Sequence, residues 1–159
     1  MFISERVQLL LDEISALLTE KGHTLAVSEA ACGGLISSYL VAIPGASKYF
    51  TGGTLVYSLK SRLKLSGWSQ TDIDQYTGPS ESVALRLARN LKIELGSTYA
   101  LSETGWAGPT GDAVGTGFVA VVGPSGSKSM TFSTGSNDRA QNMEEFAFRA
   151  LQFLLDQLK

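Results

Sequence analysis

The sequence predicts an α/β domain of three layers, in which a mixed, mostly parallel sheet is flanked by helices. Helical and strand-like segments alternate along most of the chain, which is typical of a partly parallel sheet. Two further strand-like segments then follow as a hairpin, and an amphipathic helix ends the chain. With 159 residues, 43% of them hydrophobic, we expect one domain over residues 1–159.

The first half of the chain is expected to alternate helix and strand. Apolar residues recur every three or four positions over residues 4–21, and Gly22 then ends this helix. Residues 25–27 are apolar and predict a first strand, and a glycine-containing turn leads from it into a helix over 35–42. Residues 54–57 predict a second strand.

In the middle of the chain, two capping signals predict where helices begin and one glycine predicts where a helix ends. A basic helix is expected over 59–65, and Ser69 with Asp72 three residues later resembles a capping box for a short helix. Ser80 is placed to cap a longer helix with one leucine-lined face, which Gly96 ends.

The last part of the chain predicts a strand, a loop, a hairpin and a helix. Residues 99–102 read as a third strand that leads into a glycine-rich loop over 105–115. Strands over 116–122 and 128–134 are separated by a short turn, so we expect them to pair antiparallel. Residues 138–158 then have the apolar spacing of a helix.

Charge and cysteine content narrow the classes of partner. The net charge is −2 and the chain has no run of lysine or arginine, so we expect neither nucleic acid nor a membrane surface as partner. Cys32 is the only cysteine and His23 the only histidine, so we expect no internal disulfide, no metal and no cofactor. We therefore expect a cytoplasmic protein whose partner is a small molecule or another protein.

Three segments that follow predicted strands compete for the ligand site, because sites in such folds lie where strands lead into loops. They are residues 28–34, 57–62 and 104–115, and we expect them to converge. Amides at Gly33 and Gly34, at a helix start, would face an anionic ligand. The alternatives are that the glycine pair serves packing and that the basic stretch is a solvated helix face.

Small and polar residues along the chain resemble, in order and spacing, the CinA C-terminal domain family. The matching residues are Glu29, Gly33, Gly34, Pro44, Gly45, Ser47, Tyr57, Ser58, Gly67, Ser80, Glu81, Thr104, Gly105, Ala107, Gly108, Pro109, Val114, Gly115, Thr116, Asp138 and Arg139. The resemblance runs from about residue 24 to the last helix and implies a CinA C-terminal domain-like fold. The family includes the nicotinamide mononucleotide deamidases called PncC.

The family resemblance implies a hydrolytic chemistry that this chain is not equipped to perform in the usual way. The family converts nicotinamide mononucleotide to the nicotinate nucleotide and ammonia, without a metal, and uses a serine and a lysine. Ala30 stands at the serine position, Arg62 at the lysine position, and Ala31 and Cys32 follow where the family has cysteine and threonine. Alanine cannot attack a carbonyl, and arginine is a poor general base.

The resemblance also implies which residues form the site. The substituted catalytic positions are Ala30 and Arg62, with Tyr57 and Cys32 beside them, and the implied ligand-binding residues are Glu29, Gly33, Gly34, Ser58, Thr104, Gly105, Gly108 and Arg139. The chain is then a catalytically impaired or altered member that keeps a nucleotide or anion pocket, with Arg62 and Arg139 as anion partners.

Two other functions stay open. An active amidase would recruit Ser28, Cys32, Thr51 or Ser58 as nucleophile, with Lys60 as base, and the dipole of the following helix would favour a Cys32 thiolate. The alternative for Cys32 is a small packed residue, which is the commoner role of a lone cysteine among alanines and glycines. A purely structural interaction protein would neither bind nor hydrolyse the nucleotide.

The family resemblance further implies a homo-oligomer. Four aromatic residues are candidates for the interface, although aromatic residues at such spacing more often belong to a core. They are Tyr39, Tyr49, Phe50 and Trp68.

Overall fold

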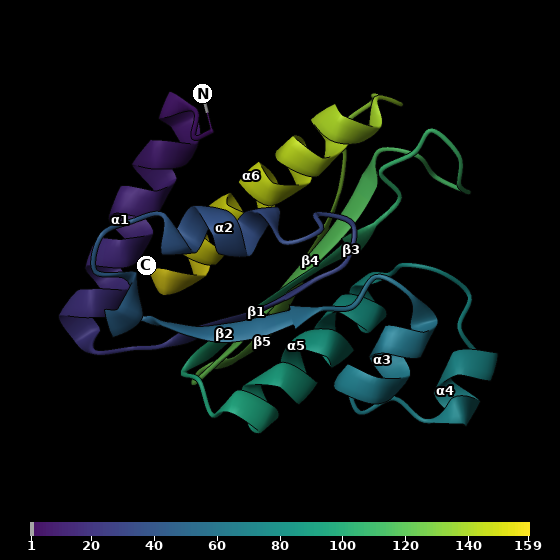
Figure 1. The fold of residues 1–159 in the computed structure, drawn as a ribbon, viewed down its shortest axis with the longest axis horizontal. Coiled ribbons are helices and arrows are strands. Elements are labelled where there is room, and N and C mark those ends of the chain that lie inside the picture. The colour runs from purple at the N-terminus through teal and green to yellow at the C-terminus, as the bar shows by residue number, and fades with distance from the viewer. Residues whose placement is uncertain (1) are drawn as a thin grey trace.

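A computed structural model describes residues 2–159, and its centre is one mixed sheet of five strands in the order β2-β1-β3-β4-β5 (Figure 1). The strands are β1 (Leu25–Glu29), β2 (Phe50–Leu55), β3 (Tyr99–Gly105), β4 (Thr116–Gly123) and β5 (Gly126–Ser133). β1 pairs in parallel with β2 and β3, whereas β4 is antiparallel to both β3 and β5. Only β4 therefore runs against the other four, which confirms a mixed sheet with mostly parallel strand directions.

Helices cover both faces of the sheet and complete the three predicted layers (Figure 1). α1, α2 and α6 lie on one side, and α3, α4 and α5 lie on the other. The helices are α1 (Glu5–Lys21), α2 (Leu35–Val41), α3 (Leu59–Leu65), α4 (Gln70–Asp74), α5 (Glu81–Leu95) and α6 (Arg139–Leu158), with a short 3-10 turn η1 (Ala46–Lys48). None of the helices within residues 2–159 is both long and apolar enough to cross a bilayer.

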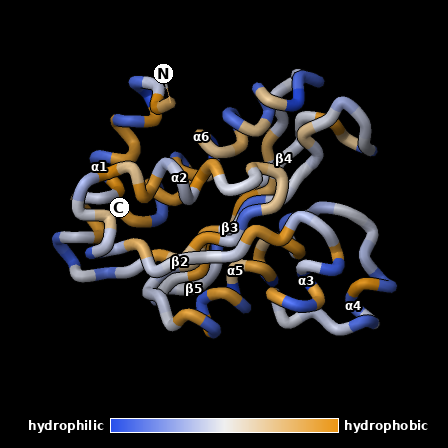
Figure 2. The backbone as a smooth tube through the Cα atoms, viewed as in Figure 1, coloured by the Kyte–Doolittle hydropathy of each residue, from blue (hydrophilic) through white to orange (hydrophobic). Residues whose placement is uncertain are grey.

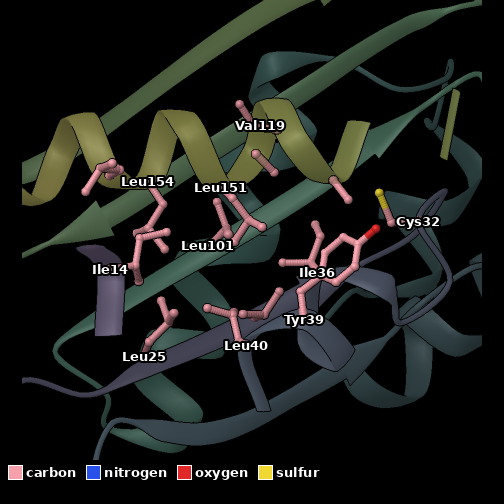
Figure 3. Packing of buried hydrophobic residues seen from close by; sticks show 14 of the residues in the cluster. Ile14, Leu25, Cys32, Ile36, Tyr39, Leu40, Leu101, Val119, Leu151 and Leu154 are labelled. Atoms are coloured by element: carbon pink, nitrogen blue, oxygen red, sulfur yellow. The ribbon is translucent and has the colours of Figure 1, made fainter. Parts of the chain in front are cut away.

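The two faces of the sheet bury different amounts of apolar side chain. The larger core lies between the sheet and α1, α2 and α6, where Ile14, Leu101 and Leu154 are fully buried (Figure 3). On the other face, Ala84 and Ala88 of α5 pack on small residues of the strands, so this helix approaches the sheet closely. Figure 2 shows hydrophobic residues along the central strands of the sheet and hydrophobic residues alternating with hydrophilic ones along the helices.

The helix boundaries that the sequence predicts are confirmed to within a residue or two. Ser4 accepts a hydrogen bond from the Val7 amide at the start of α1, and Gly22 ends that helix in the left-handed conformation that favours glycine. The predicted capping box of Ser69 and Asp72 is present in both directions at α4.

The second strand is not where the sequence predicts it. β2 spans Phe50–Leu55 rather than residues 54–57, because its pairing with β1 begins at Phe50. The strand therefore includes Gly52 and Gly53, and a Cβ at Gly53 would lie 1.9 Å from the Val27 carbonyl oxygen. Gly53 is thus required by the close approach of two strands.

The third strand is longer than predicted. Residues 103–105 continue the pairing with β4, and Gly105 stands opposite Gly117. A Cβ at Gly105 would lie 2.6 Å from the Thr116 carbonyl oxygen, so this glycine also permits close strand pairing. The glycine-rich loop consequently begins at Trp106, and Thr104 and Gly105 belong to the sheet.

Candidate functional site

The three predicted segments converge at the edge of the sheet where β1, β2 and β3 end. The first segment is joined by hydrogen bonds from the Ala30 and Cys32 amides to Glu103, the residue directly before the third segment. The second and third segments are joined through α6, because Arg139 donates to both Tyr57 and Gly108. The convergence predicted from the sequence is therefore present.

Backbone amides of the turn between β1 and α2, residues 30–34, donate hydrogen bonds to acceptors of the protein itself. We call this turn the closed turn. The Glu29 carboxylate accepts hydrogen bonds from the amides of Gly34 (3.2 Å), Ile36 (2.9 Å) and Ser37 (2.8 Å). The Gly33 amide donates to the Ala30 carbonyl oxygen at 3.3 Å. The prediction that the Gly33 and Gly34 amides face a ligand is therefore wrong, because Gly33 already donates to the Ala30 carbonyl oxygen and Gly34 to the Glu29 carboxylate.

Glu29 has a structural task at this turn. It is 1% exposed and closes the start of α2, where the helix leaves amides without backbone acceptors. Gly33 and Gly34 have φ angles of 64° and 101°, which favour glycine and let the chain reverse direction. The reading of the glycine pair as a packing and turn device is thus the one that the geometry supports.

A second carboxyl, Glu103 of β3, lies beneath the closed turn. Its Oε1 accepts hydrogen bonds from the amides of Ala30 (3.1 Å) and Cys32 (2.9 Å), and the residue is fully buried. Oε2 has no hydrogen-bond partner within residues 2–159. Burial raises the pKa of Glu103 to about 7, with a further contribution from the nearby Glu29, although the two amide hydrogen bonds oppose the shift.

Cys32 is not a thiolate at the start of a helix. The side chain is 1% exposed and belongs to the larger core (Figure 3), and its thiol donates to the Met143 carbonyl oxygen at 3.5 Å. Burial, followed by the charges of Glu103 and Glu29, raises the pKa of Cys32 well above its ordinary value. The expectation that the helix dipole favours the thiolate is wrong, because desolvation and two carboxyls outweigh it.

Arg62 does not lie on a solvated helix face. Whereas Lys60 and Lys64 of the same helix are exposed, Arg62 is 3% exposed, and its Nε donates to the Val56 carbonyl oxygen at 3.2 Å. Its guanidinium lies 5.3 Å from the ring centre of Trp68 and 5.2 Å from that of Tyr76. Arg62 thus stabilises the packing of α3 against α4 through cation–π contacts and is not an exposed anion ligand.

The arginine corner, which we define as Tyr57, Gly108 and Arg139, is the open part of the site. Arg139, the first residue of α6, is exposed, and it donates to the Tyr57 hydroxyl at 2.9 Å and to the Gly108 carbonyl oxygen at 2.5 Å. Tyr57 is 63% exposed. Three residues far apart in the sequence therefore present a guanidinium and a phenol at the surface.

Asn142 is a supporting residue that the sequence prediction missed. It is fully buried on α6, and its side-chain amide donates to the carbonyl oxygens of Ala107 and Ser136, both at 2.9 Å. These bonds hold the glycine-rich loop against the start of α6. The sequence signal that could have identified Asn142 was a polar residue on the apolar face of a predicted helix. For Glu103, the corresponding signal was a carboxylate within an apolar strand.

The remaining candidates for a recruited nucleophile are poorly placed. Ser28 is 1% exposed within β1, and Thr51 lies near the amino end of β2, away from the site. The Ser58 hydroxyl caps α3 by accepting from the Ser61 amide at 3.2 Å. The implied ligand residue Thr104 is also buried, at 1% exposure.

Groups that could hold a metal were sought among His, Cys, Asp and Glu side chains. Within residues 2–159, no three or more of these side chains cluster in a way that could bind an ion.

The fold and the site together define a small α/β domain with a polar site at the strand ends of a mixed sheet, formed by two turns and the start of the last helix. The chain belongs to the CinA C-terminal domain family, whose model matches residues 7–158.

Relatives and solved structures agree with this assignment. CinA-like proteins from Chlorobium limicola and Myxococcus xanthus are 34% and 40% identical to this chain, over 89% and 67% of its length. The matches cover 35% and 26% of those proteins, so the chain spans about a third of the length of the curated relatives it matches.

Two solved structures share the fold. The competence/damage inducible protein CihA from Agrobacterium tumefaciens has a TM-score of 0.92 at 22% identity, covering 99% of this chain and 98% of that one. The competence or damage-inducible protein from Enterobacter asburiae has a TM-score of 0.89 at 24% identity, covering 96% and 98%.

Proposed function

We propose that this domain binds a pyridine mononucleotide such as nicotinamide mononucleotide at the arginine corner and that it is a catalytically impaired or altered member of its family. The observation that carries the proposal is the exposed guanidinium of Arg139 beside Tyr57 and the Gly108 carbonyl. A guanidinium suits a phosphate, and a phenol suits a flat ring. Family membership supports a nucleotide as the ligand.

The loss or change of catalysis rests on the closed turn. Ala30 has only a methyl group where the family resemblance implies the nucleophile, and it is 4% exposed. Cys32 beside it is neutral and buried, and Arg62 is engaged by Trp68 and Tyr76. Neither an activated nucleophile nor a general base of the family's kind is therefore available at these positions.

Calorimetric titration with nicotinamide mononucleotide tests binding. We expect saturable binding by the parent chain and an affinity loss of about tenfold or more for Arg139→Ala, because a charge-assisted contact to phosphate is removed. Arg89→Ala, which removes another exposed arginine from α5, is the matched control and should bind like the parent. Equal affinity in the two variants would argue against the arginine corner.

An ammonia assay separates binding from hydrolysis. We expect no release by the parent chain, and restored release by Ala30→Ser or by Ala30→Ser combined with Arg62→Lys would support an ancestral amidase site. Release by the parent that Cys32→Ala abolishes would instead establish an active amidase with a recruited nucleophile. An absence of both binding and turnover would indicate a structural interaction protein.

We also propose a cytoplasmic homo-oligomer, as the family resemblance implies. Three of the four candidate aromatic residues, Tyr39, Tyr49 and Trp68, are at most 5% exposed and belong to the protein interior, so only the half-buried Phe50 is left for an interface. Analytical sedimentation should show a species heavier than the 16.9 kDa chain. A monomer at all concentrations would contradict the oligomer.

A further inference from the structure

Glu103 is the buried titratable group for which the proposed function has no use. Its carboxyl is fully buried and bridges two amides of the closed turn, those of Ala30 and Cys32, through a single oxygen atom. The residue belongs to β3, whereas the turn follows β1. One carboxyl oxygen thereby fixes the turn backbone to the neighbouring strand at the position where the family resemblance implies the nucleophile.

The second oxygen makes the arrangement sensitive to the charge state. Oε2 is buried and has no hydrogen-bond partner in the described part of the chain, so the two turn amides are the main groups that stabilise the ionised carboxylate. The titratable groups that act on it are Glu29 from β1, whose charge disfavours a second negative charge nearby, and the Cys32 thiol from the turn, which favours the ionised form. Burying a charge with so few compensating donors is costly.

We propose that Glu103 is a positioning residue that fixes the closed turn, so that the geometry of the turn depends on whether this one carboxyl accepts from the Ala30 and Cys32 amides as a carboxylate or as a neutral acid. The ionised form accepts strongly from the Ala30 and Cys32 amides, and the neutral form accepts more weakly. The inference rests on the proposed function only in one respect, namely that the turn adjoins the nucleotide site.

Nuclear magnetic resonance of the ligand-free protein tests the proposal. The amide resonances of Ala30 and Cys32 and the Glu103 side-chain carboxyl carbon are followed from about pH 5.5 to about pH 8.5, a range that brackets the expected midpoint. We expect all three to shift together with a midpoint of about 7. Flat amide resonances across this range, or a midpoint that differs from that of the carboxyl carbon, would overturn the proposal.

Two variants isolate the carboxyl. Glu103→Gln keeps an acceptor oxygen and should remove the titration of both amides, whereas titration that persists in this variant would contradict the role of Glu103. Glu81→Gln is the matched control, because Glu81 on α5 accepts from Ser129 and Thr131 and its pKa is lowered, so its loss should leave the titration unchanged. The wild-type measurement decides the question even if Glu103→Gln fails to fold.

A nucleotide titration over the same pH range distinguishes this inference from the proposed function. The phosphate of nicotinamide mononucleotide titrates with a second pKa of about 6 in both experiments, so the informative quantity is the ratio of the wild-type affinity to that of Glu103→Gln. We expect this ratio to change at least about threefold across the midpoint. If the amide resonances shift with pH but no nucleotide binds, the proposed function is contradicted and the positioning role of Glu103 stands. Binding that is pH-dependent to the same degree in Glu103→Gln would overturn the coupling.

Discussion

The closed turn and the arginine corner adjoin the same sheet edge but are built in opposite ways. At the closed turn, the buried carboxyl groups of Glu29 and Glu103 accept hydrogen bonds from backbone amides. The side chains of the turn itself are small. In the arginine corner, the polar groups belong to exposed side chains of Tyr57 and Arg139. The difference teaches that a glycine-rich turn after a strand is not in itself a ligand cradle, because its amides can be consumed by the protein.

The largest expected effect breaks the closed turn. Glu29→Ala removes the acceptor of three amides at the start of α2, and leaving these donors unpaired should lower the free energy of unfolding by about 3 to 5 kcal/mol. Urea denaturation measures the loss. Glu29→Gln, which keeps one acceptor oxygen, should lose less, and a loss below about 1 kcal/mol for Glu29→Ala would contradict the internal role of this carboxylate.

The next effect depends on pH. The pKa of Glu103 is raised from its ordinary 4.5 to about 7 in the folded protein, so the folded state binds the proton more tightly than the unfolded state. The resulting stabilisation is complete below about pH 4.5 and is lost as the pH rises through about 7. Relative to Glu103→Gln, the wild-type protein should lose on the order of 3 kcal/mol between these limits, as measured by urea denaturation. A constant difference between the two proteins would contradict the shift.

A smaller effect is expected at the thiol of the closed turn. Cys32→Ala should lower the free energy of unfolding by about 1 kcal/mol, because it deletes one small buried group from the core. In the native parent, the neutral buried thiol should react with a disulfide reagent far more slowly than in the urea-unfolded chain. Equally rapid labelling of both states would show an accessible thiolate and reopen the recruited-nucleophile function.

The smallest effect on stability is expected at the arginine corner. Arg139→Ala and Tyr57→Phe should each change the free energy of unfolding by less than about 0.5 kcal/mol, because both side chains are exposed. The same urea titrations that detect the loss in Glu29→Ala measure this. A loss above about 2 kcal/mol would show that the corner holds the fold together and would weaken its interpretation as a ligand site.

The sequence predicts the elements well where one physical signal dominates. Helix ends follow from caps such as Ser69 and Gly22, and the convergence of three loops follows from the rule for strand ends. The strand boundaries of β2 and β3 were wrong because Gly53 and Gly105 serve close strand contacts that only the pairing reveals.

The site was predicted less completely than the fold. The spacing of the residues predicts that Gly33 and Gly34 lie at the helix start. It does not show that Glu29 accepts a hydrogen bond from the Gly34 amide, or that the Ala30 carbonyl oxygen accepts one from the Gly33 amide. Likewise, the position of Arg62 on a basic helix does not show that its guanidinium turns inward between two aromatic rings. Such assignments depend on contacts between segments that are distant in the sequence.

Gly53 has a practical consequence for anyone who maps this site by random mutagenesis. Any other residue at this position would push a Cβ into the Val27 carbonyl and displace β2 from β1, and Tyr57 follows only four positions later. Variants at Gly53 should therefore lose the proposed nucleotide binding as thoroughly as variants at Arg139, although Gly53 does not belong to the arginine corner. Only a measurement of folded protein beside each activity value would keep such a position from being scored as part of the site.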